Sequence, residues 1–324
     1  MLCLQVFSEM GDFLVKTAVL LAAYNGIKNL PALLESLEAQ TDSDFSVLMQ
    51  DDGSEDGTQQ LLESWREKDS RFVFGGFQGR HFGPAGNFLS LLRQTDADYA
   101  LLCDQDDLWA PDKIGTLKHA IMDAASVYGP QTPLLVHSDC SLIDEKGSII
   151  ADSFFRHQGW DPAALSLNRL LVQNNVTGCT LIMNRPLIDL VSAYGKAKEL
   201  FMHDWFIALT AASFGRILFL PQPLTFYRQH GDNAVGASRK GLARRGLQAL
   251  SRRKDARRRI LLTYTHTMVF RKLYKEKLPP EADRITSEYL ATRQMPKIRR
   301  MVAVRRLGCT MQSPVTRMGQ LLFG

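Results

Sequence analysis

The sequence TAVLLAAYNG at residues 17–26 is a continuous apolar run that stops at an asparagine and a glycine. An apolar run without alternation is typical of a strand buried on both faces, and the Asn-Gly pair predicts a turn directly after it. The next leucines, at positions 30, 33, 34 and 37, have the spacing of one face of a helix. We therefore predict a buried strand, a turn and an amphipathic helix, in this order.

The order of strand, turn and helix is repeated through the first half of the chain. Strands that alternate with helices across short connections indicate an α/β domain with a mostly parallel central sheet and helices on both faces. In such sheets, ligands bind beyond the carboxyl ends of the strands. The further predicted elements are strands at 45–50, 71–74, 99–103 and 134–138 and helices at 58–68, 87–94 and 111–126.

The alternation weakens after about residue 145, where we predict one more strand at 179–183 and a helix at 202–213. We expect this part of the chain to shape the site of a second substrate. From residue 238 onward the composition shifts to arginine and lysine, which predicts a basic helical appendage. The predicted organisation is an N-terminal leader at 1–16, an α/β domain at 17–237 and a basic helical C-terminal region at 238–324.

The net charge of +5 over 324 residues conceals two oppositely charged parts. Residues 1–237 contain 17 lysines and arginines against 29 aspartates and glutamates, a net charge of −12. Residues 238–324 contain 22 basic and 5 acidic residues, a net charge of +17. Charge asymmetry of this kind predicts a tail that meets an anionic surface.

Membrane-spanning and secreted classes of protein do not fit the sequence. The apolar runs are shorter than the roughly 20 residues of a membrane-spanning helix, and residues 2–7 are too short for the core of a signal peptide. The five cysteines are widely spaced and form no C-x-x-C pair, which disfavours a zinc site or a disulfide framework. We expect a cytoplasmic location.

Polar and acidic residues follow three of the predicted buried strands: Asn25-Gly26, Asp51-Asp52-Gly53-Ser54 and Asp104-Gln105-Asp106-Asp107. The three carboxylates of the last segment repel one another unless a cation lies nearby. Hard oxygen ligands of this kind suit Mg²⁺ or Mn²⁺. The alternative is a solvated acidic turn that caps the next helix.

In this order and spacing, the segments LLAAYNG (20–26), QDDGSEDGT (50–58) and LLCDQDDLW (101–109) resemble the family 2 glycosyltransferases, which have the GT-A nucleotide-sugar-binding fold. The segments FMHDW (201–205) and FYRQH (226–230) are similar to the bacterial rhamnosyltransferase-type members of that family. The resemblance extends over residues 17–236, and it implies a glycosyltransferase of the hexosyltransferase class.

The resemblance also implies roles for particular residues. Asp204 would be the general base that takes the proton of the acceptor hydroxyl, and the alternative for it is a helix cap. Mg²⁺ or Mn²⁺ would be held by Asp104, Asp106 and His230 beside the departing nucleoside diphosphate. Asp52 would hydrogen-bond the base or the ribose. The complete set of implied nucleotide-sugar-binding residues is Ala23, Tyr24, Asn25, Asp51, Asp52, Asp104 and Arg228.

The predicted function is the inverting, metal-dependent transfer of a sugar, with rhamnose favoured, from a nucleotide-sugar donor to a growing, lipid-linked surface polysaccharide. The arginines between residues 244 and 259 are interspersed with leucines, which predicts an amphipathic helix at the inner, anionic face of the cell membrane. A helix packed on the acidic face of the catalytic domain is the alternative. For the whole chain the alternative is a nucleic-acid- or partner-binding protein, and the −12 charge of residues 1–237 argues against nucleic acid.

Overall fold

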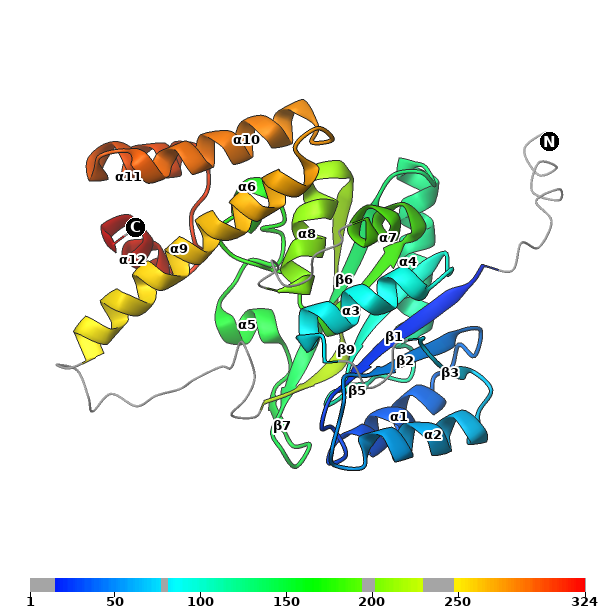
Figure 1. The fold of residues 1–324 in the computed structure, drawn as a ribbon. Coiled ribbons are helices and arrows are strands. Elements are labelled where there is room, and N and C mark those ends of the chain that lie inside the picture. The colour runs from blue at the N-terminus through cyan, green and yellow to red at the C-terminus, as the bar shows by residue number, and fades with distance from the viewer. Residues whose placement is uncertain (1–14, 77–80, 194–201, 230–247, 324) are drawn as a thin grey trace, which may run out of the picture.

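The computed structural model describes residues 15–76, 81–193, 202–229 and 248–323. Its centre is a nine-stranded sheet that carries helices on both faces (Figure 1). The strands are β1 (Thr17–Ala23), β2 (Ser46–Asp51), β3 (Phe72–Phe74), β4 (Tyr99–Asp104), β5 (Leu108–Trp109), β6 (Leu134–Ile143), β7 (Ile149–Ala151), β8 (Leu181–Asn184) and β9 (Arg216–Arg228).

The strands lie in the order β3-β2-β1-β4-β8-β6-β9-β5, and β7 pairs with β6. The parallel arrangement predicted from the sequence is confirmed for β1, β2, β3 and β4, and β6 and β9 are also parallel. Four pairings are antiparallel: β8 with β4, β8 with β6, β7 with β6 and β5 with β9. The sheet is therefore mixed rather than mostly parallel. A parallel neighbour needs a crossover of about a dozen residues, and the short turn between β6 and β7 allows only a hairpin.

The helices are α1 (Leu30–Glu38), α2 (Thr58–Lys68), α3 (Gly83–Gln94), α4 (Lys113–Tyr128), α5 (Phe154–Gln158), α6 (Leu167–Leu170), α7 (Arg185–Ser192), α8 (His203–Phe214), α9 (Gln248–Tyr274), α10 (Pro280–Ala291), α11 (Lys297–Arg306) and α12 (Pro314–Phe323), with the 3₁₀ turns η1 (Gly178–Thr180) and η3 (Thr292–Gln294). None of the described helices is long and apolar enough to cross a membrane.

The two faces of the sheet are covered by two separate hydrophobic clusters. In β1, Val19 and Leu21 belong to the cluster under α1, α2 and α4, while Ala18 and Leu20 belong to the cluster under α3, α7 and α8. This alternation follows from the two-residue period of a strand. The four leucines predicted to form one face of a helix are all fully buried in α1, which confirms that prediction.

The C-terminal helices share the second hydrophobic cluster with α3, α7 and α8. On α9, the ring of Tyr274 stacks on Phe206 of α8 at a centroid distance of 5.9 Å, and its hydroxyl donates to the backbone oxygen of Leu190 at 2.9 Å. His266 of α9 meets the ring of Trp205 at 4.8 Å. Apolar contacts therefore join this basic region to the α/β domain, and the boundary predicted at residue 237 lies outside the described residues.

Candidate active site

The carboxyl ends of three parallel strands lie side by side at one edge of the sheet. Ala23 at the end of β1 is paired with Asp51 at the end of β2, and Ala22 is paired with Asp104 at the end of β4. The three polar segments singled out in the sequence are therefore adjacent in space, as their positions after parallel strands predict.

The turn after β1 is held from both sides. Gln105 accepts a hydrogen bond from the backbone N–H of Tyr24 at 2.7 Å and donates to the Tyr24 oxygen at 2.8 Å. Asn25 has a φ of 48°, a left-handed conformation that asparagine tolerates, and its N–H donates to Ser54 Oγ at 2.8 Å. A side chain at Gly26 would collide with Gln105. Tyr24, beside the strand ends, is 45% exposed.

Asp51 shapes the turn after β2. Its buried carboxylate accepts hydrogen bonds from the backbone N–H of Gly53 at 3.1 Å and of Ser54 at 2.9 Å, and also from the Ser54 hydroxyl. This is the side-chain-to-backbone pattern by which aspartate stabilises a turn. Asp51 therefore fixes the conformation of the loop in which Ser54 lies, and Ser54 contacts Asn25 in the turn after β1.

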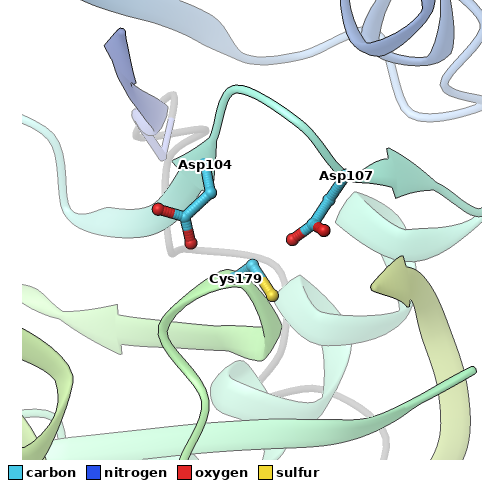
Figure 2. Close-up of side chains that lie close together, drawn as sticks. All are labelled: Asp104, Asp107 and Cys179. Atoms are coloured by element: carbon cyan, nitrogen blue, oxygen red, sulfur yellow. The ribbon is translucent and has the colours of Figure 1, made fainter. Parts of the chain in front are cut away.

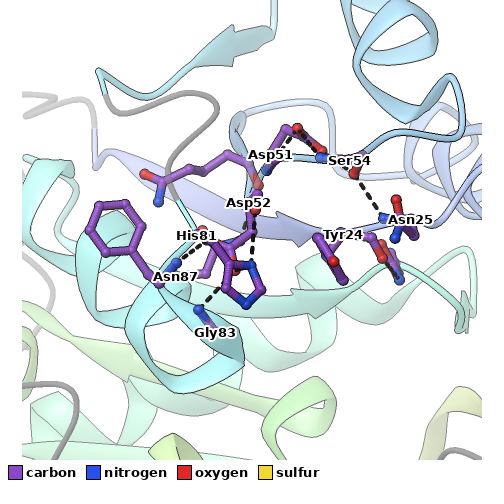
Figure 3. Close-up of polar contacts among 12 residues, drawn as sticks. Tyr24, Asn25, Asp51, Asp52, Ser54, His81, Gly83 and Asn87 are labelled. Atoms are coloured by element: carbon purple, nitrogen blue, oxygen red, sulfur yellow. Dashed lines mark hydrogen bonds and ion pairs between the residues drawn. The ribbon is translucent and has the colours of Figure 1, made fainter.

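Asp52 joins β2 to the beginning of α3 (Figure 3). Its buried carboxylate accepts hydrogen bonds from the N–H groups of Phe82 at 2.6 Å and Gly83 at 2.8 Å. The ring of His81 lies 3.2 Å from the same carboxylate through Nδ1, and its centroid is 5.1 Å from the Tyr24 ring. Asp52 thus holds the beginning of α3 and contacts His81, a residue that was not singled out by the sequence and whose ring lies beside Tyr24.

A second group lies at the turn between β4 and β5, where the side chains of Asp104, Asp107 and Cys179 point toward one another (Figure 2). One ligand atom from each residue lies within 4.8 Å of the others. Asp107 is completely buried; its Oδ1 accepts from the backbone N–H of Arg228 at 2.9 Å, and its Oδ2 has no hydrogen-bond partner among the described residues. A buried carboxylate oxygen without a partner is costly unless it binds a ligand.

Electrostatics in this group favour a cation. Burial, and next the charge of Asp106, raise the pKa of Asp107 to about 7. The pKa of Asp104 is raised well above its usual range by loss of solvation and next by Asp107, although Asp104 keeps some exposed surface. Asp106, a predicted ligand, is close enough to act on both pKa values but is not a member of the 4.8 Å group. His230, the other predicted ligand, lies outside the described residues.

A buried lysine lies directly beside the acidic group. The Lys113 ammonium donates to the backbone oxygen of Cys179 at 2.6 Å and lies 3.4 Å from the centre of the Trp109 ring. Burial lowers its pKa to about 8, and its charge in turn lowers the pKa values of the neighbouring aspartates. Sequence reasoning missed this residue. The available signal was that Lys113 precedes Leu117 and Ile121 at four-residue spacing, on the apolar face of α4.

Asp204 lies in the first turn of α8, at the same end of the sheet. Burial raises its pKa to about 6, and its Oδ1 accepts a hydrogen bond from the N–H of Trp205 at 2.6 Å. A hydrogen bond with the Gly178 backbone opposes the shift. The charge of Asp204 also raises the pKa of Asp104, so the predicted base and the acidic group are electrostatically coupled.

The residue before Asp204 is also buried at this end of the sheet. The ring of His203 lies 4.2 Å from the Phe88 ring, its Nε2 has no partner among the described residues, and burial lowers its pKa to about 3. A side chain at Gly178 would approach this Nε2 to 3.0 Å. His203 is therefore neutral at physiological pH, and Gly178 allows η1 to pack closely on α8.

Arg228, at the end of β9, binds backbone oxygens around the acidic turn. Its Nε donates to the oxygen of Asp106 at 2.8 Å, and its Nη1 donates to the oxygens of Asp144 and Glu145, each at 3.1 Å. Together with the bond from its N–H to Asp107, these contacts attach the β4–β5 turn to the β6–β7 hairpin. The structure therefore places Arg228 beside the predicted site and gives it a positioning contact with Asp107.

Comparison with known proteins agrees with this geometry. The family model described as glycosyl transferase family 2 matches residues 18–187. The chain is 28% identical over 231 residues to dTDP-rhamnosyl transferase RfbG of Shigella flexneri, a match that covers 67% of this chain and 74% of that protein. The chain spans 74, 66 and 57% of the lengths of three curated relatives.

Two solved structures share the fold. TarS 1-349 of S. aureus, in complex with UDP-GlcNAc, has a TM-score of 0.54 at 16% identity over 94% of this chain and 88% of that chain. The mannosyltransferase PcManGT of Pyrobaculum calidifontis, in complex with GDP-Man and Mn²⁺, has a TM-score of 0.53 at 16% identity over 90% of this chain and 72% of that chain. A longer TarS chain is covered over only 43% of its length.

The mixed α/β sheet and the polar groups at its strand ends define a glycosyltransferase with the GT-A fold that uses a nucleotide-sugar donor. Because the family model covers more than half of the chain, the chain belongs to glycosyl transferase family 2, and it is rhamnosyltransferase-like. These findings confirm the predicted family, fold and class of enzyme.

Proposed function

We propose that this enzyme is an inverting, divalent-metal-dependent transferase that moves rhamnose from a dTDP-linked donor to a lipid-linked surface polysaccharide at the inner face of the cell membrane. One observation carries the proposal: Asp204 packs against Gly178, where an added Cβ would lie 3.5 Å from the Asp204 Cβ, and Gly178 directly precedes Cys179 of the acidic group. A base and a cation-binding group are thereby available at one site. The similarity to a dTDP-rhamnosyl transferase supports the choice of donor.

The residues of the acidic group suit a divalent cation. Asp104 and Asp107 offer hard carboxylate oxygens, and the buried Oδ2 of Asp107, which accepts no hydrogen bond from any described residue, is the kind of atom that a cation would satisfy. The Cys179 thiol is held neutral by burial, which raises its pKa, and is the least suitable of the three for Mg²⁺ or Mn²⁺. Asp106 and His230 are further proposed ligands. A bound cation would supply positive charge beside the leaving diphosphate.

The donor base would lie at the turns after β1 and β2. The exposed ring of Tyr24 offers a stacking surface, and His81 and Asp52 lie beside it with polar atoms. Ala23, Asn25 and Asp51 belong to the strand ends and turns that hold this surface. We place Arg228 near the diphosphate, where it also supports Asp107.

The chemistry that we assign to Asp204 is proton abstraction. With a pKa of about 6 the carboxylate is ionised at neutral pH, and it is more basic than an exposed aspartate. The acceptor oxygen would attack the anomeric carbon from the side opposite the diphosphate, the bond from that carbon to the diphosphate would break, and the hydroxyl proton would pass to Asp204. A single displacement inverts the anomeric configuration.

The test is a donor-binding screen on the purified protein by thermal shift, because a ligand that binds only the native state raises its apparent stability. We expect dTDP-rhamnose with Mn²⁺ to raise the melting temperature more than UDP-GlcNAc or GDP-mannose with Mn²⁺, and EDTA to reverse the increase. A larger shift with UDP-GlcNAc or GDP-mannose would contradict the rhamnose assignment. Equal shifts with and without EDTA would contradict the metal site.

A further inference from the structure

The outer face of α11 carries an apolar ridge. Ile298 is 77% exposed and Val302, one helical turn later, is 61% exposed, whereas Val304 is 4% exposed on the inner side of the same helix. Val304 belongs to the hydrophobic cluster that α9, α10 and the α/β domain share. The helix therefore buries one apolar side chain and presents two others to solvent.

The neighbouring helix α12 has the same arrangement. Val315 is 73% exposed and Met318 is 59% exposed, while Leu321 is 7% exposed. Both helices lie at the end of the molecule away from β1 and α1 (Figure 1). Four of the six most exposed large hydrophobic side chains among the described residues belong to these two helices, so the exposure is concentrated there. We call Ile298, Val302, Val315 and Met318 the α11–α12 ridge.

The α11 part of this ridge is flanked in the sequence by basic residues. After Glu288 the sequence contains seven lysines and arginines and no aspartate or glutamate. The α11 helix carries five of the seven, and Arg299, Arg305 and Arg306 are exposed on it. Within the part of the chain that the structure describes, no ion pair joins the basic side chains of α11 to an acidic group.

We propose that the α11–α12 ridge docks on an anionic phospholipid bilayer. The exposed apolar side chains would enter the boundary between headgroups and acyl chains, and the arginines beside them would meet lipid phosphates, as in other basic amphipathic surfaces. An anionic bilayer repels carboxylates, which explains why the segment after Glu288 contains none. A protein partner or a second copy of the chain would not require their absence. Docking on a bilayer would bring the enzyme to the lipid-linked acceptor of the proposed function. The biological purpose of the surface rests on that proposed function, but its binding to lipid does not.

The ridge lies within the basic region predicted at 238–324, but the amphipathic helix predicted there was the arginine-rich stretch at 244–259 with its interspersed leucines and the adjoining Ile260 and Leu261. Arg257, Arg258 and Arg259 are exposed on α9, but Ile260 is only 5% exposed and packs in the hydrophobic cluster. Arg244 and Arg245 lie outside the described residues. Among the described residues of the C-terminal helices, the four most exposed apolar side chains are therefore those of α11 and α12, and Leu261 of α9 is 49% exposed.

The test is co-flotation of the full chain with vesicles of phosphatidylglycerol and phosphatidylcholine, compared with phosphatidylcholine alone. We expect salt-sensitive binding to the anionic vesicles only. Ile298→Ser with Val302→Ser should lower the vesicle partition coefficient at least tenfold, and Arg299→Gln with Arg306→Gln should lower it on the order of 25-fold, because each basic residue contributes about fivefold. The matched control is Val127→Ser, since Val127 is 73% exposed on α4, and it should change nothing.

Three outcomes would overturn the proposal: no flotation of the full chain, equal loss of binding by Val127→Ser, or unchanged binding by both double variants. Concentration-dependent dimerisation that the Ile298→Ser, Val302→Ser variant abolishes, without any vesicle binding, would assign the ridge to a second copy instead. Thermal shift with dTDP-rhamnose on the same variants monitors folding and donor binding. A failed donor screen alongside positive flotation would therefore refute the proposed function and leave the docking surface intact.

Discussion

Asp204→Asn should make the enzyme more stable and nearly inactive. Burial raises the pKa of Asp204 from 3.8 to about 6. Because the pKa is higher in the folded state than in the unfolded state, the ionised carboxylate destabilises the fold; this cost is absent below pH 4, grows as pH rises to 6 and is constant above it. At about 1.36 kcal/mol per pKa unit, the cost at neutral pH is about 3 kcal/mol.

An asparagine keeps the shape of the side chain without its charge. It loses part of the hydrogen bonding that the carboxylate accepts from the backbone of Trp205 and Gly178, and this loss destabilises the variant by about 1 kcal/mol. The expected net gain at pH 7.5 is about 2 kcal/mol, seen as a rise in melting temperature of about 4 °C, and the gain should disappear at pH 4. Loss of the base should lower kcat by roughly two orders of magnitude or more, with donor affinity nearly unchanged.

The assay is thermal denaturation at pH 4, 6 and 7.5, combined with steady-state kinetics. The control is Asp123→Asn, on the exposed face of α4, which should alter neither stability nor kcat. A variant of Asp204 that is less stable at pH 7.5 than the wild type would refute the assigned burial cost. Near-normal kcat would reduce Asp204 to a helix cap, and a large loss of donor affinity would make it a donor contact.

Three further predictions concern the metal and the donor base. Asp106→Asn and Asp107→Asn should each abolish turnover and most metal-dependent donor binding; a variant that keeps wild-type turnover is not a ligand. Burial and Asp106 raise the pKa of Asp107 to about 7, so protons should compete with the cation for this carboxylate. The Mn²⁺ concentration that gives half-maximal activity should therefore rise about tenfold for each pH unit below pH 7. A half-maximal Mn²⁺ concentration that does not depend on pH would contradict this. Tyr24→Ala should raise the donor KM about tenfold with little change in kcat, since base stacking contributes about 1–3 kcal/mol, and an unchanged KM would exclude stacking.

The parallel half of the fold was predictable because local patterns determine it. The apolar runs that become β1, β2 and β4, and the leucines of α1, fall within a residue or two of their predicted positions. The half of the sheet formed by later strands was less predictable. Strand β9 contains Pro221 and Pro223, which argue against a strand, and β9 accommodates them where its register against β6 shifts beside Asp139.

Part of the site was also predictable, because it follows from local sequence patterns and from the parallel order of the strands. Parallel strand ends bring Asp51 and Asp104 together by topology alone, so their proximity follows from the sequence. The choice of Asp107 rather than Asp106 as the carboxylate grouped with Asp104 depends on how a three-residue turn bends between β4 and β5. The contribution of Cys179 comes from a distant segment, which no local pattern could indicate.

The most direct measurement is transfer of radiolabelled sugar from dTDP-rhamnose into a lipid-linked acceptor fraction, followed together with release of dTDP. Wild-type enzyme with Mn²⁺ should label the lipid fraction with one dTDP released per sugar, and the new linkage should have the inverted anomeric configuration. Both signals should be lost with EDTA and in Asp204→Asn. Retained configuration, or undiminished transfer in Asp204→Asn, would contradict the assignment of this site as an inverting, base-assisted transferase.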